Sequence, residues 1–425
     1  MNQPLRPATT RDRQVPDDEN VLSPEFWKRL PDDRDDVFAA LRAEPEPAFF
    51  PYSAVPGWPA QSGFWAITRY TDIEEVCRNP QAFSSEPTVY RLEETAPPGD
   101  QGSMLNLDAP RHTRLRRIVA RAFTPRMLRT VEKDIRVVAR RVTGELAERG
   151  ACDFATEVAS AMPPEVICTM MGIPPSGRAN AVEVAELGMA LTDPNCPVSL
   201  DEFMPKLAEC LRLVEELVRH RREHPADDLI TALGMANSDG EHLTHEEIAS
   251  FFMTLVSAGV ETVRESLSNA LVLLTEHPDQ RELLLGDFER WLAPTADEVV
   301  RHCSPVAWIR RNVRQEYTLG SHTFRPGDRL TLYYASGNKD ETVFENPRRF
   351  DITRAPHPHL GYGGPGPHYC LGAQLALREI TTMLHELYSR LPGLHATAPP
   401  VRRQVGIISS VVGLPCAVAP RMMRG

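Results

Sequence analysis

Apolar positions recur at helical spacing over most of this chain, while short alternating runs are few. Helical periodicity extends over residues 110–146 and, with proline-marked interruptions, over residues 154–222. A longer helix is predicted to begin near Thr244, where Thr244 and Glu247 fit a capping box, and to end before Pro278. The pattern therefore predicts a mainly α-helical protein.

Strand-like segments are short and lie mostly in the C-terminal half. Residues 64–68 form one such run, and residues 306–332 contain several more. Between these regions a helix is expected around residues 295–303, where Thr295 and Glu298 offer a second candidate capping box. The predicted fold class is α+β, mainly α with small β-sheets.

The N-terminal segment differs from the rest of the chain. It is polar, contains proline and carries mixed charge, so it resembles neither a signal peptide nor a membrane anchor. No linker, repeat or low-complexity tract divides the remaining sequence, which predicts a flexible arm over residues 1–25 and a single domain over residues 26–425. No apolar run approaches the roughly 20 residues of a membrane span, so we expect a cytoplasmic protein.

Charge and cysteine content exclude several functional classes. The 425 residues include 47 basic and 58 acidic side chains, a formal net charge of −11 that argues against nucleic acid as the main partner. The eight cysteines are dispersed, with no Cys-x-x-Cys pair, so neither a disulfide framework nor a zinc finger is predicted. Only Cys370 lies in a segment that suggests chemistry.

Cys370 lies in a loop rich in glycine and proline, just before a helix predicted over residues 373–391. Glycine lets the backbone approach a bulky planar ligand, and proline stiffens the loop. Backbone N–H groups at the start of the helix would favour a thiolate. Such a sulfur suits the axial ligand of a haem iron, the alternative being a glycine-rich turn with a buried structural cysteine.

This loop resembles the haem-ligand segment of the cytochrome P450 family, Phe-Gly-x-Gly-x-His-x-Cys-x-Gly. The matching positions are Gly364, Gly366, His368, Cys370 and Gly372. The aromatic position holds Gly363 instead, with Tyr362 one residue earlier. The resemblance covers residues 25–420 and implies the cytochrome P450 fold, with haem b between the long helix and the cysteine loop. It implies that Cys370 ligates the iron and that Gly364, His368 and Gly372 contact the cofactor.

The long helix carries two small residues, Ala258 and Gly259, followed by Glu261 and Thr262. A small pair lets a flat ligand lie against the helix, and an acid–alcohol pair with water can relay protons. Taken alone, this run of residues is weak evidence for a proton relay, because the hydroxyl of a helical threonine often donates to a carbonyl of its own helix. Its resemblance to the family signature Ala-Gly-x-Asp/Glu-Thr implies haem contact for the small pair and proton delivery by Glu261 and Thr262.

Basic residues precede this helix in the sequence. His112 and Arg116 lie one helical turn apart, and buried haem propionates need cationic partners. Both match propionate contacts of the family, as do Arg311 and His368. For each residue taken by itself, a solvated charge is the alternative interpretation.

The same basic segment suggests an electron donor. It contains a cluster of arginines: Arg111, Arg114, Arg116, Arg117, Arg121 and Arg126. Such a cluster is usually a solvated helix face, but on the cysteine side of the haem it would dock an acidic ferredoxin. The chain has no flavin or iron–sulfur segment, so electrons would come from a separate ferredoxin and NAD(P)H-dependent ferredoxin reductase.

Glu298 and Arg301 have the spacing of residues that share a helix face. Taken alone, the two residues are interpreted as a surface ion pair, or Glu298 as part of the capping box at Thr295. The family motif Glu-x-x-Arg instead buries this pair with a third residue, matched here by Arg354, in a structural role.

The resemblance also places substrate contacts. The candidate wall residues are Val89, Tyr90, Met104, Met189, Leu191, Val260, Trp308, Ile407 and Ile408. They are mostly apolar, which suits a lipophilic substrate, although apolar positions are also simply core. Residues 335–372 look similar to actinobacterial enzymes that oxidise steroid side chains, which makes a steroid one candidate.

The leading hypothesis is a ferredoxin-dependent cytochrome P450 monooxygenase that uses O₂ to hydroxylate or epoxidise a hydrophobic small molecule. One alternative is a tailoring oxidase of secondary metabolism that couples or desaturates a polyketide, macrolide or peptide. Another is a haem carrier or sensor without catalysis, against which the acid–alcohol pair argues.

Overall fold

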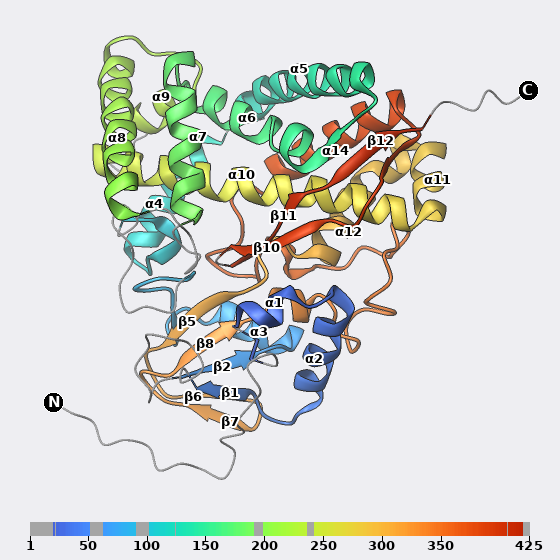
Figure 1. Ribbon diagram of the computed structural model, residues 1–425. Helices are drawn as coiled ribbons and strands as arrows, with labels where there is room; N and C mark the ends of the chain where they lie inside the picture. Colours follow the sequence, from blue (N-terminus) through green and yellow to red (C-terminus); the bar gives the residue numbers. More distant parts are fainter. Residues whose placement is uncertain are drawn as a thin grey trace, which may run out of the picture.

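The computed structural model describes residues 20–21, 23–51, 63–90, 102–123, 125–190, 199–235, 242–405 and 407–419. Most helices surround α10 (His245–Glu276), which runs through the helical part of the molecule (Figure 1). The main sheet lies on the other side of the molecule, with the N-terminal helices α1, α2 and α3 beside it. The predicted class, mainly α with small sheets, is confirmed.

The helices and strands have these bounds. The helices are α1 (Pro24–Lys28), α2 (Pro31–Ala43), α3 (Tyr70–Arg78), α4 (Arg111–Ala122), α5 (Pro125–Arg149), α6 (Met162–Met171), α7 (Pro175–Ala190), α8 (Leu200–Glu223), α9 (Leu229–Met235), α10, α11 (Pro278–Gly286), α12 (Phe288–Cys303), α13 (Tyr334–Gly337) and α14 (Ala373–Arg390), with short turns η2 (Met104–Asn106), η3 (Ala155–Ala159) and η4 (Leu360–Tyr362). The strands are β1 (Ala48–Pro51), β2 (Gly63–Ile67), β3 (Phe83–Ser84), β4 (Ala151–Asp153), β5 (Ile309–Val313), β6 (Tyr317–Leu319), β7 (His322–Phe324), β8 (Arg329–Leu332), β9 (Leu394–Ala396), β10 (Val401–Val405), β11 (Ile408–Gly413) and β12 (Pro415–Val418).

The start of α10 is fixed by the predicted capping box. The backbone N–H of Thr244 donates to Glu247 Oε2 at 2.9 Å, and the N–H of Glu247 donates to Thr244 Oγ1 at 3.1 Å. Two otherwise unpaired groups at the helix end are thereby satisfied. The helix ends at Glu276, before Pro278 as predicted. Because α6, α12 and α14 all pack against it, α10 is the central element of the helical core.

The predicted start of α12 was wrong. The helix begins at Phe288, where the Asp287 side chain caps it. Thr295 lies inside the helix, and its hydroxyl donates back to the carbonyl of Trp291 at 2.7 Å instead of capping. Pro294 also lies inside the helix, whereas a proline in the sequence normally predicts a helix boundary.

The sheets are small and mixed. The main sheet has the order β1-β2-β8-β5-β3, in which β2 and β8 are parallel and the other pairs antiparallel. A second sheet has the order β4-β12-β9, and β10–β11 and β6–β7 are antiparallel pairs. Strand β5 carries Arg311 beside Leu330 of β8, which holds this arginine at the edge of the helical core.

The N-terminal helices pack onto the sheet through an aromatic core that includes Phe26, Phe38 and Tyr333. Val21 is fully buried in the same core and accepts a hydrogen bond from Trp27 Nε1 at 3.0 Å. Packing thus begins before residue 25, the predicted end of the arm, while residues 1–19 lie outside the described chain. Among the described residues, no helix combines the length and apolar character that crossing a bilayer requires.

Candidate active site

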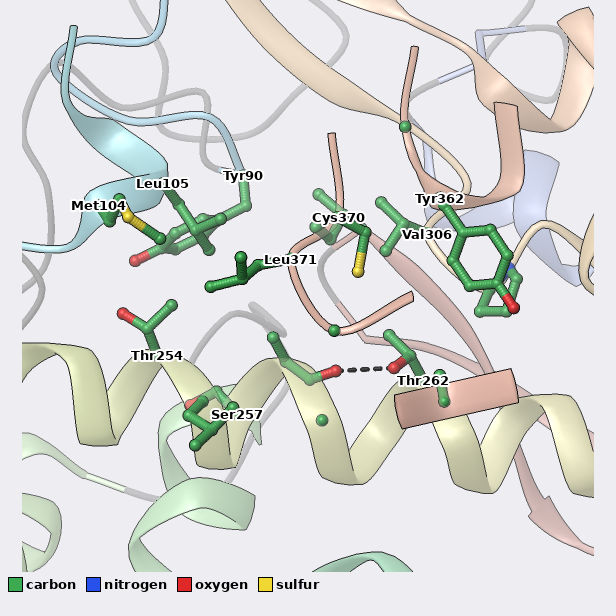
Figure 2. A pocket seen from close by; sticks show the side chains of 18 of the residues that line it. Tyr90, Met104, Leu105, Thr254, Ser257, Thr262, Val306, Tyr362, Cys370 and Leu371 are labelled. Carbon is green, nitrogen blue, oxygen red and sulfur yellow. Dashed lines mark hydrogen bonds between the residues drawn. The ribbon is translucent and has the colours of Figure 1, made fainter. Parts of the chain in front are cut away.

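A cavity of about 640 Å³ lies between α10 and the loop that carries Cys370. The sulfur of Cys370 and the hydroxyl of Thr262 lie on facing walls, and Tyr90 and Met104 lie toward one end (Figure 2). Predicted residues that line this cavity are His112, Arg116, Ala258, Gly259, Thr262, Arg311, His368, Cys370 and Gly372, with Val89, Tyr90, Met104, Ile407 and Ile408. The fold thus brings together segments far apart in sequence.

The cysteine loop is pressed against α3. Gly366 has φ of 146°, and a Cβ there would collide with the carbonyl oxygen of Cys77. A Cβ on Gly364 would lie 2.6 Å from the Cys77 sulfur. Gly364 packs against α3 and is not among the residues that line the cavity, and its cofactor contact stays a prediction. The loop is closed by the N–H of Cys370, which donates to the carbonyl of Tyr362 at 3.0 Å.

Two opposing influences act on the Cys370 sulfur. Burial raises the pKa of its thiol, and this effect outweighs the backbone N–H groups of Gly372 and Ala373 and the Arg116 guanidinium, which lower it. The N–H groups are where the sequence predicted them, but alone they do not secure a thiolate. A coordinated metal deprotonates a thiol outright, so the thiolate would come with the metal.

Four basic side chains converge at one side of the cavity. They come from α4 (His112, Arg116), β5 (Arg311) and the cysteine loop (His368). The two imidazole rings lie 4.0 Å apart, and the buried Nε2 of His112 has no hydrogen-bond partner among the described residues. Burial, with help from neighbouring cations, lowers the pKa of His112 to about 4 and that of His368 to about 2. A cluster of this composition suits a buried anion with two carboxylates.

The wall formed by α10 separates the two residues predicted to act as a proton relay. Thr262 lines the cavity, and its hydroxyl donates to the carbonyl of Ala258 at 2.7 Å, the dashed line in Figure 2. Glu261 is buried outside the cavity lining, where Arg264 and the hydroxyl of Ser410 on β11 donate to its carboxylate. Adjacent helical residues point about 100° apart, which explains the separation. The hydroxyl therefore faces the cavity while the carboxylate lies outside its lining, and proton delivery by the two residues stays a prediction.

Of three other residues predicted at the cavity, one lines it and two do not. Val260 lies two residues from Ala258, about 200° around α10, and is buried on another face. Trp308 is buried in the aromatic core of the N-terminal helices, while Ile309 after it lines the cavity. Gly259 lines the cavity, but a Cβ there would lie 2.5 Å from Ile167 Cδ1, so its small size also serves packing on α6.

Two predicted wall residues are not tested by the structure. Leu191 lies outside the described residues, as does the side chain of Met189. Gly188 of the same helix, α7, does line the cavity.

Several lining residues were missed in the sequence. They are Phe123, Ile167, Leu207, Phe251, Ser266 and Glu379. The apolar members read as ordinary core positions, because periodicity does not tell a cavity wall from a packed interface. Glu379 did carry a signal, since it interrupts the apolar stripe of α14 between Leu375 and Met383.

Glu298, Arg301 and Arg354 form a buried network. Arg301 donates to both carboxylate oxygens of Glu298, at 2.7 and 2.8 Å, and Arg354 Nε donates to the same carboxylate at 3.3 Å. The side chains of Arg301 and Glu298 are 2% and 5% exposed, which excludes the surface-pair interpretation. Arg301 also donates to the carbonyls of Asn338 and Pro347, so α12 is tied to the segment leading into the cysteine loop.

The described arginines of the predicted cluster lie in different surroundings on α4. Arg114 pairs with Glu247 at 2.7 Å at the start of α10, and Arg116 lines the cavity. Arg111, Arg117 and Arg121 are exposed, and the side chain of Arg126 lies outside the described part of the chain. Three of the six arginines are thus exposed on α4, and their role in docking a ferredoxin stays a prediction.

Comparisons with known proteins agree with this site. The cytochrome P450 family profile matches residues 199–391. The methyl-branched lipid omega-hydroxylase of Mycobacterium tuberculosis is 39% identical over 396 residues, 92% of each chain. The steroid C26-monooxygenase of the same species is 34% identical over 358 residues, 82% of this chain and 81% of that one. The Mycobacterium marinum cytochrome P450 CYP268A2, solved in complex with pseudoionone, superposes with a TM-score of 0.86 at 34% identity, covering 97% of this chain and 99% of that chain. With relatives of this identity along nearly its whole length, the chain belongs to the cytochrome P450 family.

Proposed function

We propose that this monooxygenase hydroxylates the terminal methyl group of a branched alkyl chain, in a methyl-branched lipid or a steroid side chain. Two of its relatives act on a methyl-branched lipid and at steroid C26. The observation that carries the proposal is the cavity next to Thr262, whose wall beyond the basic cluster is mainly apolar, as in Met104, Leu105 and Met253.

The residues at the cavity fit a haem-thiolate cofactor, which the family implies. Cys370 would hold the iron, and the basic cluster of His112, Arg116, Arg311 and His368 would bind the two propionates. The unpartnered Nε2 of His112 would gain a partner in this way. When bound, thiolate-ligated haem supplies the electron density that activates oxygen.

The volume of the cavity favours a substrate whose reacting end is narrow. The cavity of about 640 Å³ is lined both by the basic cluster and by the apolar wall, so cofactor and substrate share it. Only part of the volume is left for substrate beside Thr262. A branched alkyl terminus fits such a space more readily than a macrocycle, and apolar walls bind it by excluding water.

Electrons would come from a separate ferredoxin and its NAD(P)H-dependent reductase. Exposed Arg117 and Arg121 on α4 support this part of the proposal, together with exposed Tyr369 beside Cys370. Positive charge near the cysteine loop would speed association with an acidic partner.

Thr262→Ala is expected to uncouple oxygen consumption from product formation. The Thr262 hydroxyl donates its proton to the carbonyl of Ala258, so its oxygen can accept a hydrogen bond from water in the cavity. Alanine removes that acceptor. The fraction of consumed oxygen that appears in product should fall by about tenfold or more, with hydrogen peroxide making up the difference. Thr254→Ala is the matched control, because Thr254 lines the same wall and bonds back to Ser250 at 2.9 Å. Equal coupling in the two variants would contradict the role of Thr262.

The substrate proposal is tested by titrating the ferric haem protein and following the shift of its Soret band. Two matched pairs make the test specific: a methyl-branched against a straight-chain fatty acid, and a steroid with an alkyl side chain against the same nucleus without it. We expect saturable shifts only for the branched acid and the side-chain steroid, followed by terminal hydroxylation in product analysis. Shifts confined to macrolides, aromatic polyketides or bare steroid nuclei would overturn the proposal in favour of a tailoring oxidase.

A further inference from the structure

Two cysteines outside the cavity have no part in the proposed function. Cys152 on β4 and Cys416 on β12 face each other across two antiparallel strands, and their sulfur atoms lie 3.7 Å apart. Both are free thiols, and neither lines the cavity. Among the seven described cysteines, no other two thiols are joined by a hydrogen bond. Because 264 positions separate the two residues, their dispersion in the sequence conceals the pair.

The backbone holds the two cysteines at a spacing that a disulfide bridges. The N–H of Phe154 donates to the carbonyl of Leu414, and the N–H of Val418 donates to the carbonyl of Gly150, each at 2.8 Å. These bonds lie two residues to either side of the cysteines. Hydrogen-bonded pairs alternate along an antiparallel ladder, so the cysteines form such a pair too, with Cα atoms about 5.5 Å apart. Disulfides join Cα atoms roughly 4.4–6.8 Å apart, so the bond can form without rearrangement of the strands.

The two sulfurs differ in their access to solvent. In the sheet β4-β12-β9, β4 is an edge strand and β12 is central. Cys152 is accordingly half-buried, whereas Cys416 is 3% exposed. Apolar filling explains a fully buried cysteine such as Cys210, but not a partly exposed thiol opposite a second thiol. A thiol within reach of solvent beside a second, resolving thiol is typical of cysteines that respond to oxidants.

The contact between the two sulfurs also divides the chemical roles. The hydrogen bond from Cys152 lowers the pKa of the Cys416 thiol, and the same bond, together with burial, raises the pKa of Cys152. When the pair loses a proton, the negative charge therefore resides on Cys416. Thiolates are the nucleophiles in sulfur exchange, so Cys416 is suited to attack a Cys152 sulfur that has been oxidised first.

We propose that Cys152 and Cys416 are a peroxide-sensitive thiol pair that forms a reversible disulfide between β4 and β12. The oxidant is hydrogen peroxide, the by-product expected when oxygen consumption is uncoupled from product formation. The Cys152 sulfur attacks one peroxide oxygen, the O–O bond breaks, and the products are a sulfenic acid and one water. The Cys416 thiolate then attacks the sulfenic sulfur, the S–O bond breaks, and the departing hydroxide takes up the proton that Cys416 lost, forming a second water. Two thiols are oxidised and one peroxide is reduced.

The disulfide would hold the last strands of the chain on β4. Leu414 joins β11 to β12, and its N–H donates to Asp153 Oδ2 at 3.0 Å, next to Cys152. The other end of β11 carries Ile408, which lines the cavity. A covalent bond at this point closes a loop of most of the chain, which restricts the unfolded state more than a short loop does. The oxidised protein should therefore resist denaturation better than the reduced protein.

The first test is peptide mapping by mass spectrometry after the haem-loaded protein is treated with a stoichiometric amount of hydrogen peroxide and its remaining thiols are alkylated. We expect a linked peptide that contains residues 152 and 416 and is lost on treatment with dithiothreitol. The urea midpoint of the treated protein should rise by roughly 0.5–1 M and return on reduction. Absence of the linked peptide, or Cys152 recovered as a sulfinic acid beside an unmodified Cys416, would overturn the proposal.

Serine variants separate the two steps. In Cys416→Ser, peroxide should leave a sulfenic acid on Cys152 that dimedone traps. In Cys152→Ser, Cys416 should stay unmodified and the urea midpoint should not move. Cys210→Ala is the matched control and should form the linked peptide as the wild type does. Should Cys416→Ser fold poorly, Cys152→Ser at the more exposed position stays decisive, because a peroxide-induced rise in its midpoint would contradict the assignment.

The last test uses peroxide made by the enzyme itself. During turnover with ferredoxin and reductase, Thr262→Ala should accumulate the linked peptide several times faster than the wild type, and added catalase should prevent this. Undiminished cross-linking in the presence of catalase would overturn hydrogen peroxide as the oxidant. Because peroxide added from outside tests the thiol pair without turnover, failure of the proposed function is distinguishable: it would appear as absent substrate shifts or absent product.

Discussion

Cys370→Ala is expected to abolish the thiolate signature of the haem protein completely, and with it all monooxygenase activity. Cys370 is the thiol that the glycine-rich loop presents to the cavity, opposite Thr262 (Figure 2). Alanine leaves the loop able to close, because the hydrogen bond to the Tyr362 carbonyl uses the backbone N–H of residue 370. The effect should therefore be on ligation and not on folding. The measurement is the reduced carbon monoxide difference spectrum, with bound haem determined separately.

Cys210→Ala is the matched control for this variant. Cys210 is a fully buried thiol on α8 that does not line the cavity, so its loss should leave the spectrum unchanged. Cys370→Ser adds a second comparison, since it preserves size and hydrogen bonding but replaces sulfur. It too should lack the thiolate signature. A normal spectrum in either Cys370 variant would refute the assignment of this residue as the iron ligand.

Arg301→Ala is expected to destabilise the protein by about 3–5 kcal/mol, the usual effect of removing one partner of a buried ion pair. The side chain is 2% exposed and donates to Glu298 and to the carbonyls of Asn338 and Pro347. Its removal leaves the Glu298 carboxylate buried with Arg354 and the backbone N–H of Asp351 beside it, and without its shorter ion pair. Since whole domains are stable by only about 5–15 kcal/mol, we expect a large drop in the denaturation midpoint and poor haem retention.

The control for Arg301→Ala is Arg348→Ala, which removes a guanidinium from the same region of the chain. Arg348 pairs with Asp36 at 2.6 Å, but the two side chains are 40% and 70% exposed. An exposed pair of this kind contributes about 0–1 kcal/mol. Both variants are compared by urea denaturation followed by circular dichroism. If Arg301→Ala shows no larger a shift than Arg348→Ala, the buried network does not stabilise the fold as argued.

The features that sequence predicted well are those set by neighbouring residues. The capping box at Thr244 and Glu247 needs only a few residues to form, and it places the start of α10. His112 and Arg116 share a face because one helical turn separates them, and both line the cavity. The cysteine loop is equally local, since glycine and proline fix its backbone.

The features that sequence predicted poorly depend on distant partners. Glu261 accepts a hydrogen bond from Ser410, which lies 149 positions further along the chain, and no local pattern predicts this partner. Trp308 and Ile309 are both apolar, and only the packing of the N-terminal helices decides that Trp308 faces away from the cavity. Gly364 fits a motif of cofactor contact, yet its nearest constraint is the Cys77 side chain on α3. Motif matching identifies such residues but not the direction they face.

The sheet that joins β4 to β12 has a consequence for how the protein is made. Cys152 of β4 is paired in register with Cys416 of β12, 264 positions later. At ribosomal speeds of about 5–20 residues per second, β4 would wait on the order of 10–50 s for its partner strand to be synthesised. During that time a nascent chain would expose unpaired strand edges and the apolar helices beside them. Recombinant yield should therefore respond to chaperone supply and growth temperature more than to the stability of the finished fold.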